Sequence, residues 1–117
     1  MNIKDYEISV KPYNGRLFVS GNTELYGELF KHFNETPDVL ESNIGGQVAI
    51  GCGSDGMWMY LVYASDTANL VHELTHAALH IFERCGINPA SSEGEAFCYF
   101  LGYLFEESMS NLKFKTN

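Results

Sequence analysis

The chain has 117 residues, of which 45% are hydrophobic and 19% charged, and its formal net charge is −8. This length bounds it to one domain, residues 1–117, and its eight Phe, seven Tyr and one Trp exclude the composition of a disordered segment. Only seven Lys and Arg occur, scattered along the chain, so no basic stripe is present for phosphates or anionic lipid headgroups. Nucleic acid and membrane surfaces are therefore excluded as expected partners.

The amino terminus and the cysteines indicate the compartment. The first residues lack the basic and apolar regions of a signal peptide, and no stretch reaches the ~18–20 apolar residues of a membrane span. Cys52, Cys85 and Cys98 are odd in number and lack metal-type spacing, which argues against a disulfide framework. We therefore expect a cytoplasmic protein.

The first part of the chain predicts strands with one helix. Two short β-prone runs, residues 3–10 and 16–20, flank the turn dipeptide Asn14-Gly15 and predict a hairpin. A helix is expected from a cap at Asn22 to about Phe33, with Thr36-Pro37-Asp38 ending it.

A second hairpin is predicted next, followed by two helices. Residues 47–51 and 57–64 are β-prone runs on either side of a Gly-rich turn. Ser65-Asp66 is expected to cap a helix over residues 67–85, which Gly86 ends.

The second long helix is expected from Ser91-Ser92 to about Met109. Its middle, AFCYFLGYLF, is apolar all the way round, which predicts a central helix buried by its neighbours. The elements together predict an α+β fold, in which a small antiparallel or mixed sheet packs on the two helices.

The sequence His72-Glu73-Leu74-Thr75-His76 lies inside the first long helix. Residues four apart lie on one helix face, so both imidazoles can bind one ion, while Glu73, about 100° round, reaches a water beside it. Of a thousand random chains of this length, only roughly a few would contain this five-residue pattern by chance. The motif predicts one Zn²⁺ ion held by His72 and His76.

A tetrahedral catalytic zinc needs a third protein ligand. Leu79 and Phe82 occupy the positions that would be Gly and His in the pattern with a third His, so that arrangement is excluded. His80 lies four residues after His76, as His76 does after His72. Three successive side chains at this spacing diverge too much to bind one ion, so we expect His80 to be a rim or surface histidine. The remaining candidate is Glu95 on the next helix, 18 residues after His76.

Glu95 also has a structural interpretation. Ser92-Glu93-Gly94-Glu95 is a capping box, in which Glu95 would bond back to the Ser92 amide while the Ser92 hydroxyl caps the Glu95 amide. The same carboxylate oxygens cannot fill both roles. Glu93 points about 200° away from Glu95 and is the weaker ligand candidate.

His72-Glu73-x-x-His76, followed after 18 residues by Glu95-Ala96, resembles the gluzincin group of zinc metallopeptidases, which includes thermolysin-like enzymes and zinc aminopeptidases. The resemblance covers about residues 47–109 and implies a zincin-like fold with His72, His76 and Glu95 as metal ligands and Glu73 as general base. It also implies that Met57–Ala64 is the edge strand to which an extended polypeptide substrate adds.

Two features depart from thermolysin-like members. The position of their carboxylate that supports a zinc histidine is Tyr99 here, and these 117 residues leave no room for the domain that supplies their transition-state histidine. Help for the oxyanion is therefore expected from Tyr99 or Tyr103.

The expected function is that of a hydrolase, a zinc metallopeptidase in which zinc-activated water attacks a peptide bond and Glu73 transfers the proton. One alternative is a zinc-binding regulatory module of a phage or mobile element, and another is a zinc-free helical interaction domain. The small size predicts an open groove beside Met57–Ala64, with selectivity supplied by narrow substrate choice or by a regulatory partner protein that is basic or neutral.

Overall fold

The computed structural model describes residues 2–33, 45–53 and 55–112, which form an α+β fold around one mixed sheet. Strand β1 pairs antiparallel with β2, β2 parallel with β4, and β4 antiparallel with β3, so the order is β1-β2-β4-β3. The predicted fold class, α+β with a small mixed sheet, is confirmed. The strands are β1 (Glu7–Ile8), β2 (Arg16–Ser20), β3 (Gly46–Cys52) and β4 (Trp58–Ala64).

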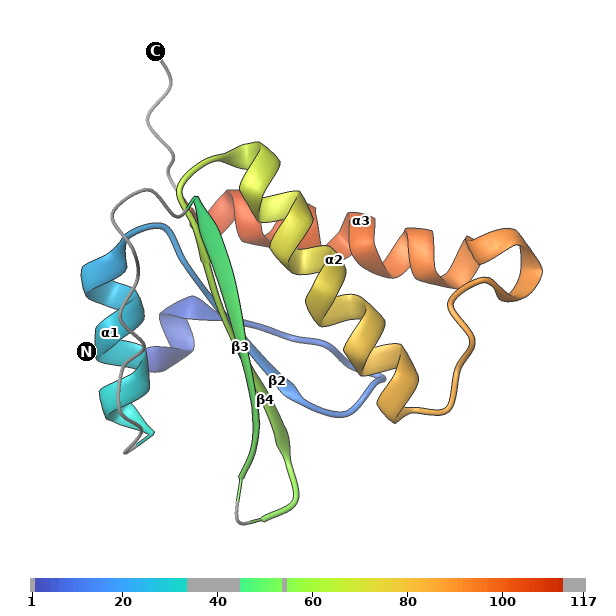
Figure 1. Ribbon diagram of the computed structural model, residues 1–117, viewed down its shortest axis with the longest axis horizontal. Helices are drawn as coiled ribbons and strands as arrows, with labels where there is room; N and C mark the ends of the chain where they lie inside the picture. Colours follow the sequence, from blue (N-terminus) through green and yellow to red (C-terminus); the bar gives the residue numbers. More distant parts are fainter. Residues whose placement is uncertain (1, 34–44, 54, 113–117) are drawn as a thin grey trace.

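The helices lie on both faces of the sheet. In Figure 1, α1 covers one face, whereas α2 and α3 lie together on the other. Two short 3-10 helices, η1 and η2, precede β1 and α3. The bounds are α1 (Thr23–His32), α2 (Thr67–Arg84), α3 (Glu95–Asn111), η1 (Ile3–Tyr6) and η2 (Ser91–Gly94).

Each face of the sheet has its own buried cluster, because side chains alternate along a strand. Tyr60 and Val62 of β4 belong to the cluster beneath α2 and α3, whereas Leu61 and Tyr63 belong to the cluster beneath α1. Strand β4 is thus buried on both faces, and it fixes the position of α2, which follows it after a two-residue turn.

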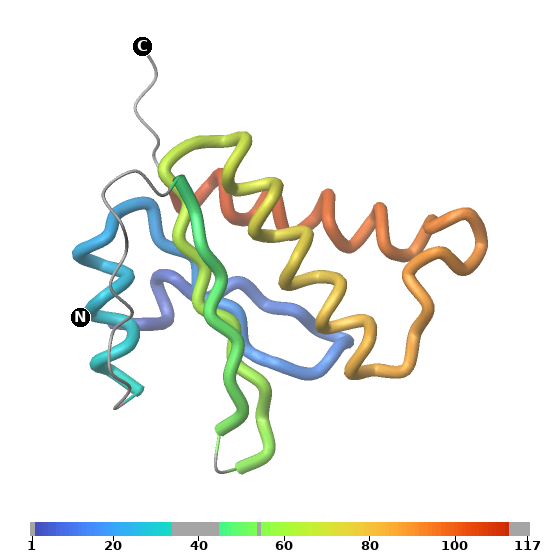
Figure 2. The backbone as a smooth tube through the Cα atoms, in the orientation of Figure 1, coloured from blue at the N-terminus to red at the C-terminus, as the bar shows by residue number. Residues whose placement is uncertain are grey.

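The first predicted hairpin is confirmed as an antiparallel pair, but its first strand is shorter than expected. Residues 3–6 form η1, and only Glu7–Ile8 pair with β2. Figure 2 shows the chain between β1 and β2 running to the face covered by α2 and α3. There the ring centroid of Tyr13 lies 4.9 Å from that of Phe82 and 4.8 Å from that of Phe100, so this connection packs on α2 and α3.

Helix α1 begins where the sequence predicts. The Asn22 side chain accepts a hydrogen bond from the Leu25 amide at 2.7 Å, which caps the helix. The helix ends at His32. The expected stop at Thr36-Pro37-Asp38 lies outside the described residues.

The prediction that Met57–Ala64 is an edge strand is wrong. Strand β4 (Trp58–Ala64) is an inner strand with β2 on one side and β3 on the other, and Met57 precedes it. The edge on this side is β3, the first strand of the second predicted hairpin. The resemblance matched β4 because it directly precedes the motif helix, but β3 occupies the outer position.

Both ends of α2 have the predicted caps. The Asp66 carboxylate accepts a hydrogen bond from the Asn69 amide at 2.9 Å, and this bond lowers the pKa of Asp66. At the other end Gly86 has φ +73°, a left-handed conformation that a glycine adopts without steric cost.

The predicted start of the second long helix is wrong. Helix α3 begins at Glu95, because Ser92 and Glu93 have φ values of 54° and 60°, which are left-handed. Gly94 is the cap residue, and no side chain caps the helix. The Glu95 amide donates to the backbone carbonyl of Ser92, not to its hydroxyl, so the capping box does not form.

The prediction that α3 is buried all round is also wrong. Its buried residues are Phe100, Leu104 and Ser108, at spacings of one helical turn. Tyr99 and Tyr103, on another face, are 77% and 40% exposed. Among the helices of the described chain, α3 included, none combines the length and the apolar character needed to cross a membrane.

Candidate metal centre

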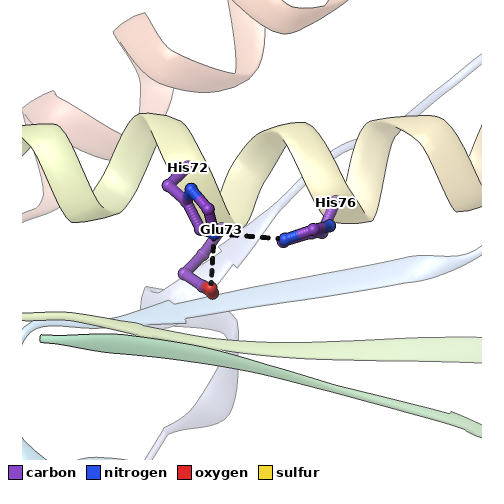
Figure 3. A group of neighbouring side chains, drawn as sticks. All are labelled: His72, Glu73 and His76. Atoms are coloured by element: carbon purple, nitrogen blue, oxygen red, sulfur yellow. Dashed lines mark hydrogen bonds and ion pairs between the residues drawn. The ribbon is translucent and has the colours of Figure 1, made fainter. Parts of the chain in front are cut away.

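Helix α2 brings the two histidines and the glutamate of the motif together. Figure 3 shows His72 and His76 on successive turns, with Glu73 directed towards the strands. The possible ligand atoms of these three side chains all lie within 4.8 Å of one another. The Nε2 atoms of His72 and His76 are 3.2 Å apart, and His72 Nε2 lies 3.9 Å from Glu73 Oε1.

The separation of the two imidazoles fits one tetrahedral ion. Two nitrogens, each about 2.0–2.1 Å from a zinc ion and separated by the tetrahedral angle, lie about 3.3 Å apart. The observed 3.2 Å is close to that value. Without a metal, the same two nitrogens share one hydrogen bond, which one imidazole donates and the other accepts.

Glu73 differs from both histidines in its burial. The side chains of Glu73 and His72 are 9% and 68% exposed, respectively. Glu73 Oε2 is buried and has no hydrogen-bond partner in the described part of the chain. A buried carboxylate oxygen without a partner is costly, so this atom is available for a ligand that brings its own donor, such as a water.

A glycine in the edge strand makes room for Glu73. A Cβ added to Gly46 would lie 2.9 Å from Glu73 Cγ and 3.1 Å from the Tyr63 carbonyl oxygen. Gly46 pairs with Ala64 in β4, so the small residues at this position of the sheet allow the carboxylate to lie against β3. The centre therefore lies where α2 crosses the edge strand.

The structure does not bring Glu95 into this group. The Phe97 ring packs on Phe82 with centroids 5.6 Å apart, which places the first turn of α3 beside the last turns of α2. Phe82 is six residues beyond His76, about 9 Å along the helix. The Glu95 side chain is exposed there, as is that of Glu93, the weaker candidate.

Tyr99 and Tyr103 also lie outside the group. Both are exposed on α3, and among the described residues neither hydroxyl bonds to the imidazoles or to Glu73. The three residues of the motif thus meet, whereas the three residues expected from the following helix do not.

His80 has a role that the sequence did not reveal. It is half-buried, and its Nδ1 lies 2.8 Å from the hydroxyl of Tyr60 in β4. Its ring centroid lies 4.8 Å from that of Trp58, and the Arg84 guanidinium lies 5.0 Å from the centre of the same indole. Position 80 is two turns beyond Glu73, so it faces the strands as Glu73 does. This spacing is the feature of the sequence that indicates contact between His80 and the sheet.

A cavity lies beside Met57–Ala64, where an open groove is predicted, but on the face of the sheet away from the histidines. Its volume is about 650 Å³, and Met59 and Leu61 line it with side chains that face α1. No residue of α2 contributes to its lining. This cavity therefore lies on the opposite face of the sheet from the three-residue group.

The chain matches no protein-family model, and neither a curated protein nor a solved structure matches it.

Proposed function

We propose that this protein is a zinc-dependent metallopeptidase of the gluzincin type, which hydrolyses a peptide bond in a polypeptide substrate. The observation that carries the proposal is the 3.2 Å separation of His72 Nε2 and His76 Nε2, which suits two ligands of one tetrahedral zinc ion. The motif glutamate lies beside them with a buried, unpartnered oxygen. A purely structural zinc has no need of such a carboxylate.

A zinc ion at this position would acidify a water molecule and polarise the carbonyl to be attacked. His72 and His76 would hold the ion through the lone pairs of their imidazole nitrogens. Glu73 accepts the proton from the attacking water and returns it to the leaving amine, and its burial against β3 keeps the carboxylate in one position. Because β3 is the edge strand on this side, it is the strand to which an extended substrate would add.

We keep Glu95 as the proposed third ligand. Its place beside the last turns of α2 means that the first turn of α3 must approach His76 when the ion binds. The left-handed residues Ser92 and Glu93 form an uncapped connection there, which can change its course at less cost than a capped helix end.

The second candidate is a zinc-binding regulatory module that lacks catalysis. The exposed rings of Tyr99 and Tyr103 favour it, because aromatic side chains are enriched in protein interfaces. Such a module would keep the zinc but would show no cleavage dependent on Glu73.

The test compares zinc content and proteolysis in four proteins. We expect one zinc per chain both in the wild type and in Glu73→Gln. Of these two proteins, only the wild type should cleave a proteome-derived peptide library. Glu83→Gln, an exposed glutamate on the same helix, is the matched control and should retain both properties. His76→Ala should lose zinc. Cleavage that persists in Glu73→Gln would overturn the assignment of the base, and a zinc-loaded wild type that cleaves nothing would favour the regulatory module.

A further inference from the structure

A cluster of Trp58, His80 and Arg84 lies beyond the metal centre along α2. The ring centroid of Trp58 lies 4.8 Å from that of His80 and 5.0 Å from Cζ of Arg84. His80 and Arg84 are four residues apart and therefore neighbours on the helix. Both side chains thus contact the same tryptophan.

The contact with Tyr60 determines which nitrogen of His80 carries the hydrogen. Tyr60 is fully buried, and burial raises its pKa to about 12, so its hydroxyl remains protonated. Among the described residues, His80 Nδ1 is the hydrogen-bond partner of this hydroxyl. If Nδ1 carried the hydrogen, the buried hydroxyl would have no acceptor; if Tyr60 donates, both groups are satisfied. The hydrogen is therefore on Nε2 of His80.

Arg84 supplies the positive charge of the cluster. It is exposed, and among the described residues no carboxylate lies within 4.0 Å of its guanidinium. Its Cζ lies 5.0 Å over the centre of the Trp58 ring, a cation–π contact that does not use the N–H groups as hydrogen-bond donors. A planar guanidinium with a second donor beside it suits a carboxylate.

The cluster lies at a distance from the metal centre that one bound peptide can span. His80 and Arg84 are one and two helical turns beyond His76, about 6 and 12 Å along α2. Ile50 of β3 pairs with Tyr60, so the edge strand continues beside the cluster. An extended chain advances about 3.3 Å per residue, so it reaches the cluster two to four residues from the position opposite His76.

We propose that Trp58, His80 and Arg84 form a subsite that binds a carboxylate of a peptide ligand. Arg84 and His80 Nε2 donate to the carboxylate oxygens, and Tyr60 is a positioning residue that keeps the hydrogen on Nε2. The carboxylate belongs to a Glu or Asp side chain or to the carboxyl terminus of the peptide. That this peptide is a substrate rests on the proposed function, whereas its binding does not.

Trp58 is the one tryptophan of the chain, so its fluorescence reports directly on the subsite. The probes are acetylated and amidated alanine peptides that carry one Glu or one Gln, together with a Gln peptide whose terminal carboxylate is free. We expect a saturable fluorescence change with a carboxylate peptide and weaker binding by about tenfold or more in Arg84→Gln, because a charge-assisted hydrogen bond is lost. Comparison of the Glu peptide with the free-terminus peptide identifies the source of the carboxylate.

Lys31→Gln is the matched control, because it removes one positive charge from α1 on the opposite face of the sheet. It should bind like the wild type. Equal responses to the Glu, Gln and free-terminus peptides, or unchanged affinity in Arg84→Gln, would overturn the subsite. These results do not depend on catalysis, so absence of Glu73-dependent cleavage would count against the proposed function alone.

The role of Tyr60 has its own readout. Nitrogen NMR of His80 should show the hydrogen on Nε2 in the wild type and a mixture of tautomers in Tyr60→Phe, together with weaker binding of the carboxylate peptide. A wild-type tautomer with the hydrogen on Nδ1 would contradict the assigned donor.

Discussion

Gly46 lies so close to Glu73 that a Cβ at position 46 would be 2.9 Å from Glu73 Cγ. We expect Gly46→Ala to displace the carboxylate while leaving both imidazoles in place. The substitution should destabilise the fold by about 1–3 kcal/mol, as overpacking does, and lower kcat for a cleaved peptide more than it lowers zinc content. Urea unfolding, metal analysis and steady-state kinetics measure these effects.

Gly51→Ala is the control for that substitution. Gly51 lies on the same strand, and a Cβ there meets nothing within 4 Å. It should leave zinc content and kcat unchanged. Equal losses in both variants would mean that the alanine acts through the strand backbone and not through Glu73.

The second prediction concerns Glu95. If Glu95 is the third ligand, Glu95→Gln should weaken zinc binding by about tenfold or more, because even an outer-shell partner of a metal ligand contributes that much. Glu93→Gln, two residues earlier and equally exposed, should bind zinc as the wild type does. Calorimetric zinc titration gives both affinities. Identical affinities in the two variants would remove Glu95 from the site.

The third prediction uses the raised pKa of Tyr60, which burial takes from 10.0 to about 12. Above pH 10 the unfolded chain loses this proton while the folded chain keeps it, so the free energy of unfolding should fall between pH 10 and 12. Tyr60→Phe should remove that part of the pH dependence. Denaturant unfolding across this range, compared between the two proteins, measures it.

Tyr99→Phe provides the comparison, because Tyr99 is 77% exposed. Its removal should leave the alkaline slope of the wild type in place. A spectrophotometric difference titration, wild type minus Tyr60→Phe, in which Tyr60 ionises near pH 10 would show that the hydroxyl is not held as described.

The fourth prediction is that Ser108→Ala does not destabilise the protein. Ser108 is fully buried in α3, and its hydroxyl has no hydrogen-bond partner among the described residues. Loss of an unsatisfied buried hydroxyl should leave stability unchanged or raise it by about 1 kcal/mol. Thermal and urea unfolding measure the change. Ser110→Ala, at an exposed position, should stay within about 0.5 kcal/mol of the wild type; a clear loss in Ser108→Ala alone would reveal a partner for the hydroxyl.

Local features of the sequence were sufficient to predict the motif group. His72, Glu73 and His76 lie on successive turns of one helix, and their geometry follows from the helix that Asp66 and Gly86 delimit. The place of Glu95 depends instead on the path of the ten residues between α2 and α3. Four of these residues are left-handed, and two of the four, Ser92 and Glu93, are not residue types that predict such a conformation.

Properties that depend on neighbours in space were not predicted correctly. The position of β4 inside the sheet follows from its pairing with β2, which the sequence around β4 does not indicate. Likewise, the apolar middle of α3 predicted full burial, but the sheet and α2 cover only one side of the helix, so Tyr99 and Tyr103 remain exposed. The partner of His80 was missed because Tyr60 lies on another element.

The parallel pairing of β2 with β4 has a consequence for the order of folding. The Ser20 hydroxyl donates to the Val62 carbonyl across 42 residues of chain, whereas β3 with β4, and α2 with α3, pair across short connections. Contacts between distant residues require a larger loop to close, so they form more slowly than local ones. We therefore expect the half of the molecule that carries the histidines to assemble first and docking of the amino-terminal strands to limit the folding rate. Until that step, β4 exposes an unpaired edge, which makes the nascent protein prone to aggregation.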